Sequence, residues 1–85
     1  MSFSVRIKAS AAKELAAIDP VNRRRLVTAI DALATDPLRG QALKGGMTGL
    51  RRIRVGDFRV VYEARQTELV VLVVRVGHRR EVYRY

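Results

Sequence analysis

The chain has 85 residues, of which 48% are apolar, so it is long enough to bury one small core, and we expect a single domain over residues 1–85. It contains no cysteine and one histidine, which provides neither a disulfide framework nor a thiolate metal site, and we expect no metal and no other cofactor. No apolar run reaches the ~18 residues of a membrane span and the first residues do not resemble a secretory signal, so we expect a cytoplasmic protein with no membrane partner.

The charge is strongly positive and unevenly distributed. Seventeen lysines and arginines against eight acidic residues give a formal net charge of +9. Residues 1–37 hold six basic and four acidic groups, whereas residues 38–85 hold eleven and four. Fourteen of the seventeen cations are arginine, whose planar guanidinium matches phosphate in two-point contacts and stacks on bases. This distribution favours a protein that binds nucleic acid over one with a generally cationic surface.

The first half of the chain predicts one strand and two helices. Apolar and polar residues alternate over residues 3–7, as in a half-buried strand. Ser10 is a candidate N-cap for a helix that continues to about Ile18. A second helix is expected to begin at Asp19–Pro20, where an acidic cap precedes a proline at the first helical position, and to end before Asp36–Pro37.

The basic residues of this first half do not form an obvious site. Arg23–Arg25 lie on the polar side of the second helix, and three consecutive positions span too wide an arc to make one binding site. We therefore interpret the triplet as a solvated surface. Residues 37–48 predict a loop, with Lys44 as its expected phosphate contact.

The most informative stretch is Leu50–Tyr62, which reads LRRIRVGDFRVVY. Gly56–Asp57 is a two-residue turn signal that closes a tight hairpin and sets Arg54 opposite Arg59. Period-2 geometry then puts Arg52, Arg54 and Arg59 on one face of the sheet. The apolar residues on the other face are Ile53, Val55, Phe58, Val60 and Tyr62. Like charges opposite one another destabilise a sheet, so this arrangement indicates a docking polyanion.

A nearly continuous apolar run, Leu69–Val76, predicts a last, buried strand. Continued alternation predicts which residues of the strand face the helices: Val70, Leu72, Val74 and Val76. It leaves on the arginine-bearing face Val71, Val73 and Arg75. The predicted fold class is α+β with element order β-α-α-β-β-β, in which two helices pack on one face of a mainly antiparallel four-stranded sheet. The neighbour of the first strand is not determined by the pattern.

Two segments, LRRIRVGDFRVVYEA over Leu50–Ala64 and VVLVVRVGHRREVYRY over Val70–Tyr85, resemble the RelE/ParE superfamily of bacterial toxins. The resemblance covers essentially the whole chain. RelE-type members are ribosome-dependent endoribonucleases that cleave messenger RNA by metal-free attack of a 2′-OH on the adjacent phosphate. ParE-type members share the fold and poison DNA gyrase instead.

The resemblance also implies a set of site residues. By motif position the catalytic residues are Arg52, Arg54, Arg59, Arg79 and Tyr83. Beyond the motif, further RNA contacts are expected from Lys44, Arg51, Arg75 and Arg80. ParE-type chains usually lack the full set, especially the terminal tyrosine, which favours the nuclease. The pair at 52 and 54 is lysine in the founding type and arginine here.

The acid and base of such a reaction are not fixed by the motif. An arginine side chain does not serve as a conventional base, so proton transfer would fall to His78, to Glu81 or to a ribosomal group. The alternative for His78 is a cap on the turn after Gly77.

The resemblance further implies partners. These are a cognate antitoxin with an acidic C-terminal segment, encoded by the adjacent gene, and the ribosome with its messenger RNA. The antitoxin would add a strand or lay a helix into a groove, giving a hetero-oligomer. Two alternatives remain to the nuclease: a gyrase inhibitor without nuclease activity, and an inactive toxin-fold partner in a repressor complex.

Overall fold

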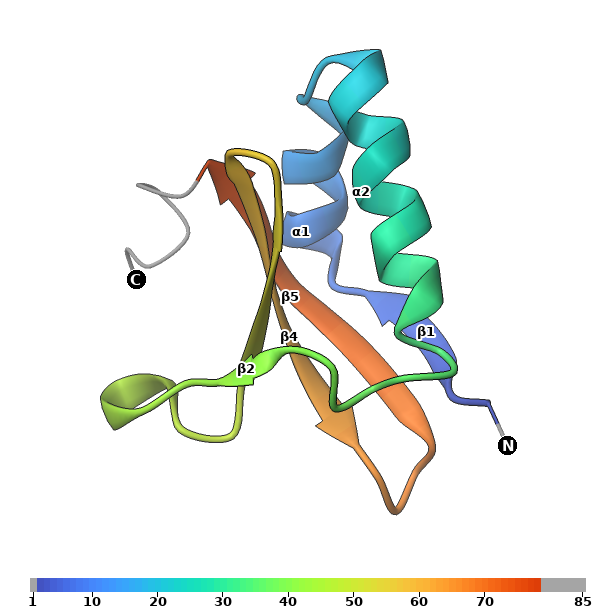
Figure 1. Cartoon of the computed structure of the whole chain (residues 1–85), viewed down its shortest axis with the longest axis vertical. Helices are drawn as coiled ribbons and strands as arrows, with labels where there is room; N and C mark the ends of the chain where they lie inside the picture. Colours follow the sequence, from blue (N-terminus) through green and yellow to red (C-terminus); the bar gives the residue numbers. More distant parts are fainter. Residues whose placement is uncertain (1, 79–85) are drawn as a thin grey trace.

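Two α-helices cover one face of a five-stranded sheet, and the opposite face carries no α-helix among the described residues (Figure 1). The structure is a computed structural model and describes residues 2–78. Its elements are, in chain order, β1 (Ser4–Ile7), α1 (Ala9–Ala16), α2 (Pro20–Ala32), β2 (Gln41–Ala42), the 3-10 helix η1 (Gly45–Met47), β3 (Arg51–Val55), β4 (Phe58–Arg65) and β5 (Val70–His78). Neither α-helix in this part of the chain is long and apolar enough to cross a membrane.

The predicted α+β class and element order are confirmed, and the sheet has one strand more than predicted. Its strand order is β1-β5-β4-β3-β2. The extra strand is β2, which pairs antiparallel with β3 through Gln41 and Ala42. The first strand, whose neighbour the pattern left open, pairs in parallel with β5 from Ser4↔Val70 to Ile7↔Val73. The other pairings are antiparallel, as expected.

One of the two predicted helix caps is confirmed and the other is wrong. At α2, Asp19 accepts hydrogen bonds from the Asn22 backbone N at 3.1 Å and from Asn22 Nδ2 at 2.9 Å, and these bonds hold the pKa of Asp19 below its ordinary value of 3.8. At α1, Lys8 occupies the cap position and its side chain makes no capping bond. Ser10 already lies inside α1, because the helix begins at Ala9, directly after β1.

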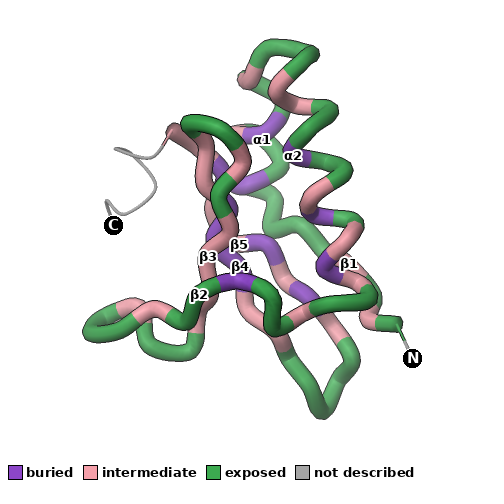
Figure 2. Tube along the Cα trace, in the orientation of Figure 1, coloured by how far each residue is buried: buried purple, intermediate pink, exposed green. Residues whose placement is uncertain are grey.

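The core lies between the helices and the sheet (Figure 2). Its buried residues are Ala11, Leu15, Leu26, Ile30, Leu33, Val60, Tyr62, Val71, Val73 and Val76. The prediction that Val71 and Val73 face away from the helices is therefore wrong. Val76 pairs with Val60 but Val73 pairs with Tyr62, so three steps along β5 match two along β4. This bulge reverses the alternation of β5, and strict period-2 counting fails across it.

Tyr62 anchors the loop that leads from α2 into the sheet. Its ring is fully buried, and its hydroxyl donates to the Pro37 carbonyl at 2.8 Å and accepts from the Gly40 backbone N at 2.9 Å. Burial raises the pKa of Tyr62 above 10.0. Gly40 has no room for a side chain, because a Cβ there would lie 2.7 Å from the Arg52 carbonyl oxygen and 2.7 Å from the tyrosine hydroxyl. The loop is thus held tightly where it meets β3.

Candidate nucleic-acid interface

The hairpin of β3 and β4 has the predicted register. Gly56 adopts a positive φ of 60° in the turn, and Arg54 lies directly opposite Arg59. The neighbouring residues Ile53, Val55 and Phe58 pack against the core on the helix side. Because side chains alternate along a strand, Arg52, Arg54 and Arg59 lie on the other side, which we call the arginine face.

The three arginines differ in how firmly they are held. Arg54 is exposed, whereas Arg52 and Arg59 are half-buried. Arg52 Nε and both Nε and Nη1 of Arg59 are excluded from solvent. Arg52 also donates through Nη2 to Gln41 Oε1 on β2. Val61, which pairs with Arg52, is fully buried although it lies outside the core cluster. The arginine face therefore has one exposed arginine, Arg54, and two half-buried ones, Arg52 and Arg59.

Arg51, expected to bind RNA, lies on the helix side of the sheet opposite Tyr62. Its Nη1 donates to the Gly40 carbonyl at 2.7 Å and to the Leu38 carbonyl at 3.2 Å. These bonds hold the same loop that Tyr62 anchors. The sequence already indicated that Arg51 faces the helices, because it lies two positions before Ile53 in the alternation of the strand. The structure does not bring Arg51 together with the arginine face.

Arg75 is directed toward α1. Its Nε donates to Glu14 Oε2 at 3.1 Å, and Glu14 Oε1 accepts from the Val76 backbone N at 3.1 Å. Strand β1 pairs with β5 only as far as Val73, so Glu14 occupies the edge of β5 just beyond it. Sequence analysis missed Glu14. The available signal was a carboxylate three residues after the buried Ala11, on the inward side of an amphipathic helix.

His78 lies at the end of β5, on the helix side of the sheet. It pairs with Phe58, and the two rings meet edge to face with centroids 6.1 Å apart and planes at 79°. Both residues line a hollow of about 310 Å³ together with Ala17 and Ile18, which directly follow α1. The sheet therefore separates His78 from Arg54 and Arg59.

Of the remaining expected site residues, the structure describes only Lys44. Lys44 is exposed at the start of η1, on a segment that projects away from the helices (Figure 1). Arg79, Arg80, Glu81 and Tyr83 lie outside the described residues. Within residues 2–78, no group of three or more histidine, cysteine or acidic side chains is placed to hold a metal ion.

Comparisons with known proteins agree on the family. Residues 5–83 match the family model described as the ParE toxin of the type II toxin–antitoxin system parDE. The chain is 30% identical to toxin RelG of Mycobacterium tuberculosis over 86 residues, which cover 99% of each chain.

Solved structures of toxin–antitoxin complexes share the fold. The RelBE2 complex from Mycobacterium tuberculosis contains a chain with 27% identity and a TM-score of 0.87, over 93% of this chain and 100% of that one. The archaeal RelE–RelB complex from Pyrococcus horikoshii gives 27% identity and a TM-score of 0.80, over 95% and 99% of the two chains. The family match over nearly the whole length, the curated relative and the shared fold lead to one conclusion: the chain belongs to the RelE/ParE superfamily of toxins of type II toxin–antitoxin systems.

Proposed function

We propose that this toxin is a RelE-like endoribonuclease that cleaves messenger RNA on the ribosome, in the cytoplasm. The proposal is carried by one observation: Arg54 and Arg59 lie directly opposite each other on the arginine face. Arg52 lies on the same face, two residues before Arg54 on β3. Like charges in this relation destabilise a sheet by roughly 0.2–1 kcal/mol per pair. A ribose–phosphate chain bound across the two residues would offset this repulsion, because its phosphates attract both guanidinium groups.

The chemistry that such a face supports is charge neutralisation. In metal-free cleavage the 2′-OH attacks the adjacent phosphate in line, the bond to the 5′-oxygen breaks, and a 2′,3′-cyclic phosphate and a 5′-OH result. Arg59 is suited to clamp a non-bridging phosphate oxygen, because it is half-buried on the arginine face directly opposite Arg54. One preorganised donor of this kind is typically worth about 3–4 kcal/mol, or roughly 10²- to 10³-fold in rate.

The proposal assigns no proton transfer to His78, because it lies on the helix side of the sheet beside Phe58. Arg52 and Arg54 would stabilise charge on the attacking oxygen and not act as bases, since a guanidinium stays protonated at physiological pH. Proton transfer then falls to Glu81 or to a ribosomal group. Arg79 would complete the phosphate clamp and Tyr83 would stack on a base, as the family resemblance implies. Free RNA should therefore be cleaved very slowly.

We also infer an antitoxin partner. The solved relatives named above are complexes in which the toxin is bound to its antitoxin. A chain with a net charge of +9 suits a partner with an acidic segment, which would neutralise the basic surface and remove its self-repulsion. The gene beside this one should encode that partner.

The direct test is cleavage of a message on programmed ribosomes. Purified toxin is added to ribosomes carrying a defined message, and the new 3′ ends are mapped and tested for a 2′,3′-cyclic phosphate. We expect cleavage within the decoding site and negligible cleavage of the same message without ribosomes. An intact message at saturating toxin would overturn the proposal.

A second candidate is gyrase inhibition, because the matching family model is the ParE toxin. A DNA supercoiling assay separates the two functions: a RelE-like toxin leaves gyrase activity unchanged, whereas a ParE-like toxin blocks supercoiling and leaves messages intact. A toxin-fold protein that only supports repression would do neither.

A further inference from the structure

Gln41, at the edge of the arginine face, combines a firmly held backbone with an exposed position. In the residue before it, the Gly40 N–H donates to the Tyr62 hydroxyl at 2.9 Å, and the Gly40 carbonyl accepts from Arg51 Nη1 at 2.7 Å. Gln41 itself pairs with Arg52 across β2 and β3. Side chains on the helix side of the sheet therefore hold the segment that presents Gln41 on the other side.

The hydrogen bond to Arg52 decides which end of the Gln41 amide faces outward. Arg52 donates through Nη2 to Gln41 Oε1. Because a guanidinium only donates, the amide oxygen must face Arg52 and the amide NH2 group must face away from it. Within residues 2–78, Gln41 Nε2 donates to no other residue. Gln41 thus presents an oriented hydrogen-bond donor at the edge of the arginine face.

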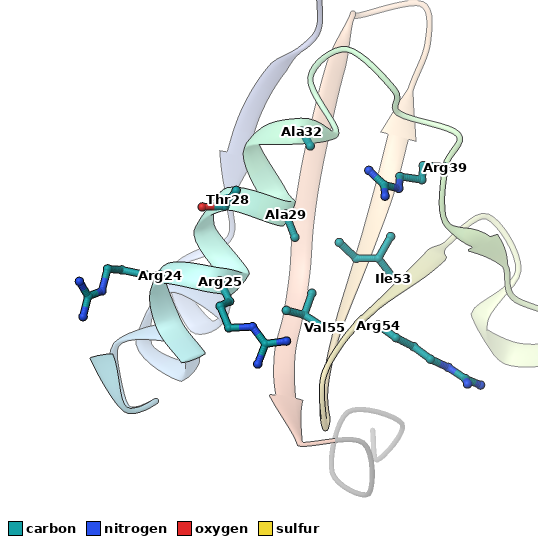
Figure 3. Close-up of a pocket in the computed structure, with 9 residues that line it drawn as sticks. All are labelled: Arg24, Arg25, Thr28, Ala29, Ala32, Arg39, Ile53, Arg54 and Val55. Carbon is teal, nitrogen blue, oxygen red and sulfur yellow. The ribbon is translucent and has the colours of Figure 1, made fainter. Parts of the chain in front are cut away.

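This donor lies close to the phosphate site proposed above. Neighbouring strands are about 5 Å apart and two residues along a strand span about 7 Å, which gives the offsets of Gln41 and Arg54 from Arg52. In the close-up of the groove between α2 and β3, the Arg54 side chain projects away from α2, as expected for the arginine face (Figure 3). A nucleotide whose phosphate lies at Arg54 and Arg59 therefore has Gln41 within reach of its base.

The chemistry of this position suits a nucleobase better than a phosphate. A neutral amide adds no charge to attract a phosphate, whereas an oriented donor is what recognition of a base edge requires. The exocyclic groups of the bases differ, since guanine O6 and uracil O4 accept a hydrogen bond and the amino groups of adenine and cytosine donate one. A fixed donor facing the base therefore favours the keto bases, guanine and uracil.

We propose that Gln41 is a base-reading residue of the RNA site, whose Nε2 donates to the exocyclic carbonyl oxygen of the nucleotide that carries the attacking 2′-OH. The choice of nucleotide follows from Arg52, which is assigned to the attacking oxygen and which orients Gln41. The proposal rests on the proposed nuclease function and adds to it a preference for guanine or uracil immediately 5′ of the cleaved bond.

The test uses four messages that differ only in the base 5′ of the cleaved bond, each cleaved in a single round on programmed ribosomes. The natural toxin should cleave the guanine and uracil messages faster than the adenine and cytosine messages. Gln41→Ala should lower this keto-to-amino rate ratio roughly 2- to 10-fold, the range expected for the loss of one hydrogen bond. The matched control is Gln66→Ala, at an exposed glutamine just after β4, and it should keep the natural ratio.

Gln41→Glu distinguishes base reading from a structural role. The carboxylate still accepts a hydrogen bond from Arg52, but it replaces the outward donor with an acceptor. The rate ratio should therefore fall below one, because the amino groups of adenine and cytosine now donate to position 41. The added negative charge affects all four messages alike and cancels from the ratio. Thermal unfolding verifies that the three variants fold.

The outcomes separate base reading from the proposed function. A natural toxin that cleaves none of the four messages would overturn both. If the natural toxin cleaves and Gln41→Ala either keeps its ratio or loses the same factor on every message, base reading is wrong and the nuclease function stands. A ratio that stays above one in Gln41→Glu would likewise contradict the donor role of Gln41.

Discussion

Removing one charge from the Arg54–Arg59 pair should make the folded toxin more stable. The two residues are directly opposite on β3 and β4, where like charges cost roughly 0.2–1 kcal/mol. For a chain of this length, 1 kcal/mol shifts Tm by about 4–8 °C, so relief of the repulsion by Arg54→Gln should contribute an increase of about 1–8 °C. We expect the same substitution to reduce toxicity, since Arg54 is assigned to the RNA site.

A double-mutant cycle isolates the repulsion. Thermal and urea unfolding are measured for the natural toxin, Arg54→Gln, Arg59→Gln and the double variant. Each single change also removes that arginine's other contacts, so the coupling term alone reports on the pair. We expect an unfavourable coupling of roughly 0.2–1 kcal/mol at low salt that largely disappears at about 1 M salt, where the Debye length is about 3 Å. A coupling of zero or a favourable coupling at low salt would refute the view that the opposed arginines lower the stability of the fold.

Three further substitutions test contacts that hold the site in place. Tyr62→Phe leaves the buried Gly40 N–H without its acceptor and should lower the free energy of unfolding by about 1–3 kcal/mol, measured by urea denaturation. Glu14→Ala removes the acceptor of the Val76 N–H and should cost roughly 1–2 kcal/mol and accelerate hydrogen exchange of that amide. Asp19→Ala should lower Tm near neutral pH and progressively less as the pH falls below 3.8, because the lowered pKa of Asp19 gives stability that exists above its unfolded-state pKa and is lost as pH falls through its folded-state pKa.

Each of these predictions has its own control. Tyr62→Leu should be worse than Tyr62→Phe, and equal stability of Tyr62→Phe and the natural toxin would show that the hydroxyl bonds contribute nothing. Exchange of the Val76 amide at the natural rate in Glu14→Ala would disprove the strand-edge role of Glu14. Asp19→Asn keeps a capping oxygen and should match the natural chain near neutral pH; an equal loss in both variants would contradict the capping account.

The features predicted correctly are those set by neighbouring residues. The Gly56–Asp57 turn fixes its own register, and the Asp19–Pro20 pair starts α2 without help from the rest of the chain. The expectation that Arg51 contacts RNA is at odds with its alternation with Ile53, a local signal that the structure follows.

The features that were missed depend on residues far apart in the sequence. The parallel pairing of β1 with β5 joins strands more than sixty positions apart and leaves no local pattern. The bulge near Val74 reverses the inward face of β5, and its cause is the pairing with β4, not the apolar run itself. The groove of about 510 Å³ between α2 and β3 forms because α2 approaches β3 near Val55, and no periodicity in the sequence predicts that approach.

The central claim is that guanidinium groups on the arginine face carry RNA cleavage, and the rate of a single round of cleavage on programmed ribosomes tests it most directly. Saturating amounts of natural toxin, Arg59→Ala and the control Arg65→Ala are compared; Arg65 lies at the far end of the same strand, exposed and paired with Glu63. We predict that Arg59→Ala cleaves about 10²- to 10³-fold more slowly than the natural toxin and that Arg65→Ala cleaves at the natural rate. Equal rates for all three proteins would contradict the claim.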